Sequence, residues 1–258
     1  GMVIPAIFLF TGLSASLRTW AQGKSSRFII ALAIYFVSFS AINYLLTLPL
    51  DFYSGFIRAH SYGLSNQTFG KWVGDSLKSL AISSFTGAAF IWVPYLIIRK
   101  SPDRWWLYVG LLSIPVLMFM TFISPVFIDP LFNKYIPVQD KALEAKIHQE
   151  INRTVIGDCN VYQVDKSVDT KEMNAYMTGV FNTKRIVLWD TTINKLNNRE
   201  ILCILAHEMG HYLMGHVWKS IVLGGALCIF ALYFVNASAL WIISKSGGAY
   251  GFKKLSDI

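Results

Sequence analysis

Four apolar segments constrain this sequence more than any other feature, because each has about the length that crosses a bilayer. A membrane-spanning helix needs roughly 20 consecutive apolar residues. In lipid, the backbone must also satisfy its own hydrogen bonds, which a helix does within one segment. The segments are Phe28–Leu50, Leu77–Ile98, Trp105–Ser124 and Val217–Ser244. The sequence therefore predicts a mainly α, multi-span transmembrane helical bundle, and the shorter apolar segment Val3–Leu17 is interpreted as a further membrane helix.

The charge composition agrees with a membrane protein and argues against a nucleic-acid partner. Only 15% of the residues are charged, whereas about 25% is usual in soluble domains. The formal net charge is +8. In a chain this apolar, Lys and Arg that flank membrane segments explain the charge, and no continuous basic run is present. We therefore expect a lipid bilayer as the environment and no nucleic acid as a partner.

Half of the charged residues fall in Pro125–Arg199, which is the one stretch that can form a folded domain outside the bilayer. Asp140–Ile151 has helical periodicity. Asn160–Val164 and Arg185–Trp189 are rich in β-branched, aromatic and other apolar residues, which is typical of strands. The predicted organisation is N-terminal transmembrane helices and loops over residues 1–124, a small α+β domain over residues 125–216, and a transmembrane helix with a polar tail over residues 217–258.

The chemistry of the chain centres on one short motif, His207-Glu208-Met209-Gly210-His211, which has the pattern HExxH. Residues four apart on an α-helix lie on one face, about one turn from each other. His207 and His211 can therefore offer two imidazole nitrogens to one metal ion, and Zn²⁺ accepts such ligands while keeping a position open for water. Zinc lowers the pKa of that water towards ~7, and the neighbouring Glu208 carboxylate can take its proton.

Two histidines and a glutamate on a helix could instead be surface residues or a hydrogen-bonded pair. The surroundings favour the metal site, because the motif follows the apolar residues Ile201, Leu202, Ile204 and Leu205. Polar groups that enter such a helix without partners would be costly to bury. The helix itself has a clear start, since Asn197 and Glu200 have the spacing of a capping box.

The three cysteines do not indicate a disulfide framework. Cys159, Cys203 and Cys228 form no CxxC pair. Cys203 and Cys228 fall in apolar helical stretches, so we expect them to be buried free thiols.

Several segments, taken together and in order, resemble the type 1 CAAX prenyl proteases, which are integral-membrane zinc endopeptidases. The resemblance covers nearly the whole chain and is far more specific than HExxH alone. Leu64 and Ser65 stand where the family more usually has Phe and Asn. The segments are Leu48–Tyr53, Gly63–Thr68, Ser124–Tyr135, Asn174–Gly179, Lys184–Thr191 and the motif HEMGHYLMGH at 207–216.

The resemblance implies a function for individual residues. It implies that His207 and His211 are zinc ligands, with one Zn²⁺ per chain, and that Glu208 is the general base. The stretch that contains Asn174, Ala175 and Tyr176 is similar to the family's substrate-binding edge strand, and an edge strand can pair with an extended peptide through its main chain. The alternative for Asn174 is an ordinary turn residue.

The chain departs from the family pattern at the third zinc ligand, which the family takes from a Glu in an ExxxD motif on a later helix. After His211 the only acidic residue is Asp257, so the sequence is interpreted as lacking a C-terminal part. His216 lies nine residues after His207, and a continuous helix would put it on the opposite face. Glu172 and Glu200 are the alternative ligands.

Two main hypotheses about function follow. The first is a membrane zinc metalloendopeptidase that cleaves extended peptides, either the C-termini of prenylated proteins or damaged membrane proteins. The second is a non-catalytic membrane scaffold or pseudo-protease that retains the fold, because the third ligand is absent. A transporter is disfavoured, since polar residues within the apolar segments are sparse.

The two arguments about membrane orientation disagree. The positive-inside rule places the loops that contain Arg18–Arg27 and Arg99–Arg104 in the cytoplasm, and the α+β domain on the other side. The family resemblance implies a cytoplasmic catalytic domain. Lys134, Lys195 and Lys219 near the domain weaken the charge count, so we adopt the orientation that the resemblance implies.

Overall fold

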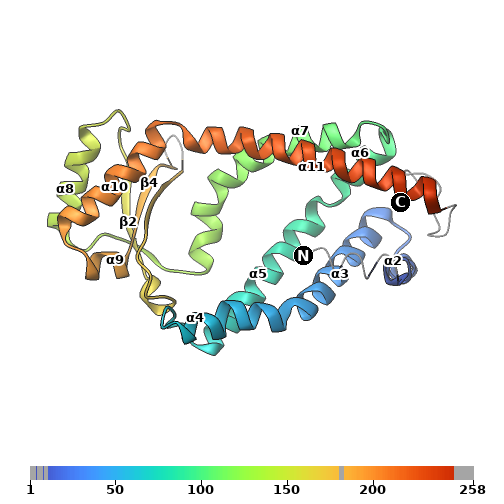
Figure 1. Ribbon diagram of the computed structural model, residues 1–258, viewed down its shortest axis with the longest axis horizontal. Coiled ribbons are helices and arrows are strands. Elements are labelled where there is room, and N and C mark those ends of the chain that lie inside the picture. Colours follow the sequence, from blue (N-terminus) through green and yellow to red (C-terminus); the bar gives the residue numbers. More distant parts are fainter. Residues whose placement is uncertain (1–3, 5–7, 9–10, 180–182, 247–258) are drawn as a thin grey trace. The chain divides into compact units, whose positions relative to one another are not determined.

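The computed structural model describes residues 4, 8, 11–179 and 183–246 of the chain (Figure 1). The chain divides into two compact units, and each is described by itself. The first unit is Gly1–Arg58, Phe69–Leu111 and Cys228–Ile258. The second unit is Ala59–Thr68 and Leu112–Leu227.

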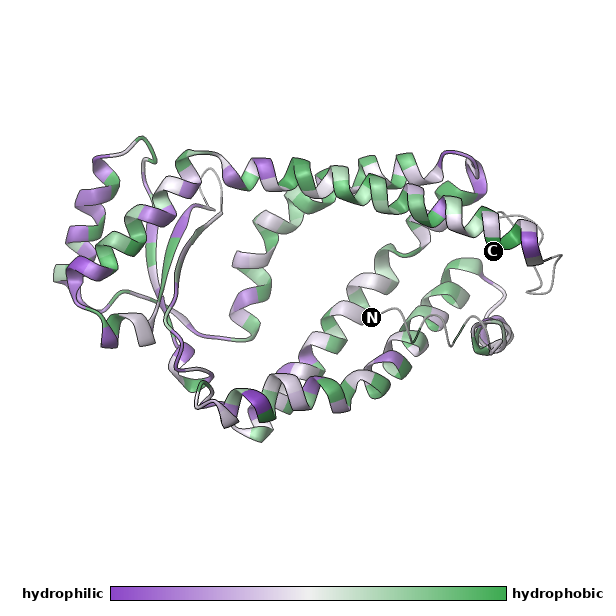
Figure 2. Cartoon of the chain, in the orientation of Figure 1, coloured by the Kyte–Doolittle hydropathy of each residue, from purple (hydrophilic) through white to green (hydrophobic). Residues whose placement is uncertain are grey.

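Long apolar helices dominate the fold, and Figure 2 shows hydrophobic residues over much of α3, α5, α7 and α11. Among the described residues, four helical stretches are long and apolar enough to cross a membrane: Phe28–Ser61, Phe69–Lys100, Trp105–Leu131 and His216–Lys245. The four predicted membrane segments are therefore confirmed as helices. The helical elements that contain these stretches are α3 (Phe28–Asp51), η1 (Phe52–Ile57), α4 (Arg58–Ser61), α5 (Phe69–Phe90), α6 (Trp92–Lys100), α7 (Trp105–Ile123), η2 (Ser124–Ile128), η3 (Asp129–Leu131) and α11 (His216–Ser246).

The polar loop predicted between the first two full membrane segments is much shorter than expected. The helix that begins at Phe28 continues to Ser61, and α5 already begins at Phe69. The first turns of α5 contain charged residues that pair with each other along the helix. Lys71 Nζ lies 2.8 Å from the carboxylate of Asp75, one turn away. A helix satisfies its backbone hydrogen bonds internally, whether its side chains face lipid or water.

Small residues and single polar contacts hold the helices of the first unit together. The hydroxyls of Tyr44 on α3 and Ser76 on α5 lie 2.9 Å apart. The indole N–H of Trp105 donates to Oδ1 of Asn236 on α11 over 2.7 Å, and both residues are buried. Gly110 on α7 lets Ile229 of α11 approach closely. Close approach at glycine is typical of membrane helix pairs.

The N-terminal membrane helix predicted over Val3–Leu17 falls partly on residues that the structure does not describe. The described chain has α2 at Leu13–Lys24 instead, packed against α3. The hydroxyl of Ser14 on α2 lies 2.8 Å from that of Tyr35 on α3. The predicted polar tail at the C-terminus also lies outside the described residues from position 247 onward.

The second unit contains a four-stranded sheet with the order β1-β2-β4-β3. The strands are β1 (Tyr135–Pro137), β2 (Asn160–Val164), β3 (Ala175–Thr178) and β4 (Arg185–Trp189). β2 and β4 run parallel, and the two outer strands pair antiparallel with them. The predicted strands at 160–164 and 185–189 are confirmed, whereas β1 was not predicted.

One face of this sheet carries the hydrophobic core, and the helices labelled α8 (Lys141–Asn152) and α10 (Asn198–Leu213) lie on one side of the strands (Figure 1). α8 and α10 supply the other side of the core, and α9 (Asp190–Lys195) connects β4 towards α10. The buried core residues include Leu143, Ile147 and Ile151 of α8, Val161, Ala175, Ile186 and Leu188 of the sheet, and Ile201, Leu205 and Met209 of α10. The helical period predicted for α8 is confirmed, since its three buried residues are four apart.

The expected burial of Cys203 was wrong. Cys203 is exposed, Cys228 is half-buried, and all three cysteines are free. Ile201, Leu205 and Met209 form the buried stripe of α10. Cys203 lies two residues after Ile201, which is about 200° around the helix and therefore on the opposite face.

Candidate metal centre

The two histidines of the HExxH motif meet at one point on α10. Nε2 of His207 and Nε2 of His211 lie 3.0 Å apart. The ring centroids are 4.5 Å apart and the rings are nearly perpendicular, at 86°. Residues four apart on a helix face the same way, so the predicted convergence of these side chains is confirmed as geometry.

The two nitrogens fit a zinc ion. Nitrogens bound at 2.0–2.1 Å in a tetrahedral shell lie about 3.3 Å from each other, close to the 3.0 Å found between the two Nε2 atoms. Two neutral imidazole lone pairs that face each other need a proton or a cation between them. His207 is exposed and His211 half-buried, so an ion can reach the pair.

A capping box sets where α10 begins. The side chain of Asn197 accepts hydrogen bonds from the backbone N–H groups of Arg199 and Glu200, at 3.0 and 3.1 Å. The carboxylate of Glu200 accepts one from the Asn197 N–H at 2.8 Å. The predicted capping box is thus confirmed. Because the Glu200 carboxylate caps the start of α10, it is not a metal ligand beside His207 and His211.

The described residues contain no group of three His, Cys, Asp or Glu side chains that could hold a metal ion. Glu172, the other alternative ligand, is exposed, and its backbone N–H and C=O bond the hydroxyls of Thr170 and Thr191. Within the part of the chain that the structure describes, no acidic side chain therefore completes a metal site with His207 and His211.

His216 does not lie where a continuous helix would put it. The motif helix ends at Leu213, and α11 begins at His216 after a turn at Gly215, whose φ is +67°. This left-handed conformation suits glycine and ends helices. The turn returns the chain so that Nδ1 of His216 lies 2.6 Å from Nδ1 of His211. The expectation that a continuous helix puts His216 on the face opposite His207 was wrong, because the helix breaks at Gly215.

The edge strand β3 lies directly beneath the motif helix. α10 packs against β3, and Ala175 of β3 is buried in the same core as Leu205 and Met209. Among the described strands β3 pairs only with β4, so its other side is the open edge of the sheet. The predicted edge strand is confirmed as a structural element, and its contact with substrate stays a prediction.

The three predicted substrate-binding residues have different surroundings. Asn174 is exposed, and its backbone N–H and C=O both bond the hydroxyl of Thr192 at 2.8 Å. Ala175 points into the core. Tyr176 points to the other face of the sheet, where its hydroxyl lies 3.2 Å from that of Tyr135. Burial raises the pKa of both phenols, so both hydroxyls stay protonated at neutral pH.

The main chain of β3 has a defined outward side. The N–H of Trp189 on β4 donates to the carbonyl of Asn174, and Ala175 is registered with Leu188. In an antiparallel ladder the backbone groups of successive residues point alternately to the two sides. Those of Asn174, Tyr176 and Thr178 therefore face β4, and those of Ala175 and Met177 face the open edge.

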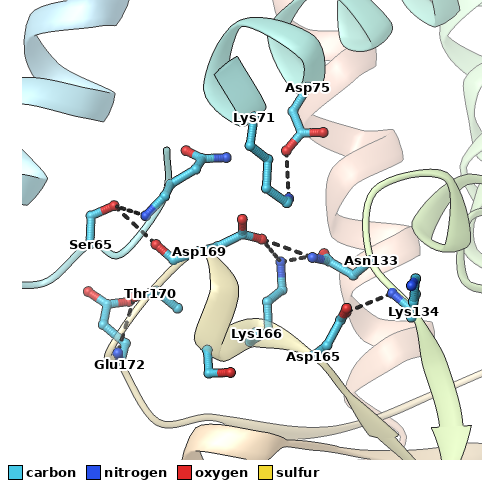
Figure 3. A network of polar contacts seen from close by, with 12 residues as sticks. Ser65, Lys71, Asp75, Asn133, Lys134, Asp165, Lys166, Asp169, Thr170 and Glu172 are labelled. Atoms are coloured by element: carbon cyan, nitrogen blue, oxygen red, sulfur yellow. Dashed lines mark hydrogen bonds and ion pairs between the residues drawn. The ribbon is translucent and has the colours of Figure 1, made fainter. Parts of the chain in front are cut away.

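A loop far away in the sequence holds the segment that leads into β3, and sequence reasoning did not identify this contact (Figure 3). Ser65 forms a β-bridge with Thr170. The Asn66 N–H donates to the carbonyl of Asp169 at 3.0 Å, and the Lys171 N–H donates to the carbonyl of Leu64 at 2.9 Å. The family resemblance does single out the segment 63–68, but the sequence alone does not show that this segment contacts residues 169–171.

Helical membrane spans joined to a small α+β domain, with paired histidines one turn apart on its central helix, define the class of membrane-integral HExxH proteins. Comparison with known families agrees. Residues 1–134 match the family described as CAAX prenyl protease N-terminal, five membrane helices, and residues 137–256 match peptidase family M48. The chain belongs to peptidase family M48, within its CAAX prenyl protease branch.

Individual relatives support this membership. The chain is 41% identical over 240 residues to the uncharacterized metalloprotease YhfN of Bacillus subtilis, covering 93% of this chain and 54% of that protein. It is 34% identical over 185 residues to CAAX prenyl protease 1 of Saccharomyces cerevisiae, covering 71% of this chain and 41% of the relative. The chain thus spans about half the length of the curated relatives it matches.

A solved structure shares the fold. The crystal structure of S. mikatae Ste24p matches with a TM-score of 0.78 and 28% sequence identity, covering 90% of this chain and 55% of that chain. The predicted fold class, a helical membrane bundle with a small metalloprotease-type domain, is confirmed.

The two-histidine arrangement predicts weak zinc binding by the 258 residues alone. Two ligands leave at least half of a tetrahedral shell to water or other groups. Dialysis of the purified chain against zinc-free buffer should leave well below one zinc per chain, measured by elemental analysis. His207→Ala or His211→Ala should remove the remainder. Tightly held, stoichiometric zinc would show that another group completes the shell, and Glu172→Gln and Glu200→Gln would identify it.

Proposed function

We propose that the chain carries the catalytic centre of a membrane-integral zinc metalloendopeptidase. The observation that supports this most is the convergence of two histidine nitrogens on a helix that packs directly on an edge strand. The first feature suits a metal ion and the second suits an extended peptide. Membership of peptidase family M48 supports the same reaction.

In this proposal His207 and His211 hold one Zn²⁺ per chain through their Nε2 atoms. Zinc, when bound, supplies a Lewis acid that polarises the scissile carbonyl and lowers the pKa of water to about 7. Glu208 is half-buried and adjacent to the first ligand. Its carboxylate accepts the proton of the attacking water and then delivers it to the leaving amine nitrogen.

The proposed substrate is an extended peptide that adds to the open edge of β3. Ala175 and Met177 would bond its main chain, because their backbone groups face that edge. Asn174 and Tyr176 would flank the peptide. The names of relatives, CAAX prenyl protease 1 in yeast and several other eukaryotes, support C-terminal segments of prenylated proteins as substrates. Damaged membrane proteins are the alternative substrates.

A non-catalytic scaffold or pseudo-protease is the second candidate. One observation favours it, namely that two histidines without an acidic partner converge among the described residues. The two candidates differ in hydrolysis of a farnesylated peptide and of an unfolded peptide. The chain joined to the part of the Bacillus subtilis relative that it does not match should hydrolyse at least one of them. Stoichiometric zinc without hydrolysis of either peptide would favour the scaffold.

We further propose a three-part organisation, with membrane helices over 1–124, the protease domain over 125–216 and a membrane helix over 217–258, and with the protease domain in the cytoplasm. Val155 in the domain is 93% exposed. After Cys203→Ser, a Val155→Cys variant should react with a membrane-impermeant maleimide only when cells are opened. Lys100→Cys, one span away, should react in intact cells. The reverse pattern would show that the domain lies outside.

The role of Glu208 predicts a specific defect in Glu208→Gln. Glutamine keeps the size of the side chain but cannot take a proton. The fusion of this chain with part of the Bacillus subtilis relative should therefore bind zinc normally and lose roughly 10²–10⁴-fold in kcat. Glu200→Gln serves as the control, because that carboxylate caps the helix. Unchanged turnover in Glu208→Gln would remove this residue from the mechanism.

The open edge predicts a binding defect in Ala175→Pro. Proline removes the outward N–H of Ala175 and leaves the ladder with β4 intact. Peptide affinity should fall about 10-fold, the equivalent of one lost hydrogen bond of ~1.5 kcal/mol. Zinc content should not change.

Two further variants separate the lost hydrogen bond from a packing effect at buried Ala175. Met177→Pro removes the second outward N–H and should also weaken binding, whereas Met177→Leu keeps it and should not. Wild-type peptide affinity in both proline variants would mean that substrate binds elsewhere.

A further inference from the structure

We propose that His216 is a positioning residue that fixes the ring orientation and the tautomer of His211. This inference rests on the proposed role of His211 as a zinc ligand. Its basis is the short contact between the two Nδ1 atoms, at 2.6 Å. His211 is therefore contacted at both ring nitrogens, by His207 at Nε2 and by His216 at Nδ1.

The two contacts determine where the protons lie. A neutral imidazole has one N–H donor and one acceptor nitrogen. If the lone pair of His211 Nε2 is directed at the metal, the ring proton must be on Nδ1. That N–H can then donate to Nδ1 of His216, which accepts, so His216 carries its own proton on Nε2. A metal ligand that donates its second ring N–H to a fixed acceptor is the common arrangement in metalloproteins.

The turn at Gly215 is what makes this contact geometrically available. On a continuous helix, a residue five positions after His211 would lie about 140° around the axis and about 7.5 Å along it. The structure instead ends α10 with the Met214 N–H bonded to the carbonyl of Gly210 at 3.0 Å, and the Gly215 N–H bonded to that of Tyr212 at 3.0 Å. With φ of +67° at Gly215, the chain turns and His216 faces back towards His211.

Partial burial strengthens the contact between His211 and His216. Both rings are half-buried, and their centroids lie 4.8 Å apart with the planes tilted by 46°. Partial burial protects the hydrogen bond from water. Because the bond restrains rotation of the His211 ring, Nε2 stays directed at the point it shares with His207. Loss of such a partner typically costs 10–100-fold in metal affinity.

The test compares the affinity of the purified 258-residue chain for Co²⁺ and Zn²⁺ in detergent, by spectroscopic and competition titrations. His216→Leu, which has no acceptor, should raise the Kd 10–100-fold. His216→Asn keeps an acceptor oxygen near the position of Nδ1 and should raise the Kd less. His148→Leu, on α8, is the matched control and should leave the Kd unchanged.

Variants of Gly215 test the same contact without altering the imidazole. A Cβ atom there meets nothing within 4 Å, so the backbone conformation is what the substitution tests. Asn tolerates a positive φ and should preserve the Kd, whereas Val does not and should raise it. Because these variants retain His216, they keep the test decisive even if His216→Leu does not fold.

A spectroscopic readout separates positioning from a general structural role. In the metal-loaded chain, ¹⁵N NMR should show the proton of the His211 ring on Nδ1, with slow exchange against water. In His216→Leu this proton should exchange rapidly. A wild-type Kd in His216→Leu would overturn the inference, as would slow exchange of this proton in that variant or a metal bound at Nδ1 of His211.

The outcomes distinguish this inference from the proposed function. If His207→Ala and His211→Ala leave the Kd unchanged, the metal site itself is wrong. If both raise it and His216→Leu does not, the metal site stands and the role of His216 is wrong.

Discussion

The packing of one face of α10 against the sheet is the contact on which the rest of the site depends. Ile201, Leu205 and Met209 are buried in the core, and they fix the rotation of the helix about its axis. This rotation determines the direction of His207 and His211, which are on the same rigid helix. It also brings the helix over β3, so one contact places the proposed metal ligands beside the strand proposed to bind substrate.

A second constraint acts at the end of that helix. The left-handed backbone at Gly215 ends α10 and begins the long apolar helix α11 one residue later. The same residue therefore separates the motif helix from the membrane span and turns His216 towards His211. A Cβ atom would meet nothing within 4 Å at this position, so the requirement for glycine is one of backbone conformation rather than space.

Local patterns predicted the elements that their own residues stabilise. The buried spacing of α8, the strands β2 and β4 and the capping box at Asn197 follow from periodicity and from side chains close in sequence. Where prediction failed, the cause lay in a distant partner or in a single turn. Cys203 is exposed because of the way α10 rotates onto the core, and β1 exists through its pairing with β2.

The sequence by itself determined that the chain forms apolar helices of membrane length and that two histidines share one helical face, because both depend only on local geometry. Tertiary structure alone decided which backbone groups face the open edge of the sheet, since that depends on the register of β3 with β4. Tertiary structure alone also decided that residues 64–66 form hydrogen bonds with the segment before β3 and that His216 contacts His211. Hydrogen bonds between residues about a hundred positions apart, and a chain reversal at one glycine, leave no periodic signal in the sequence.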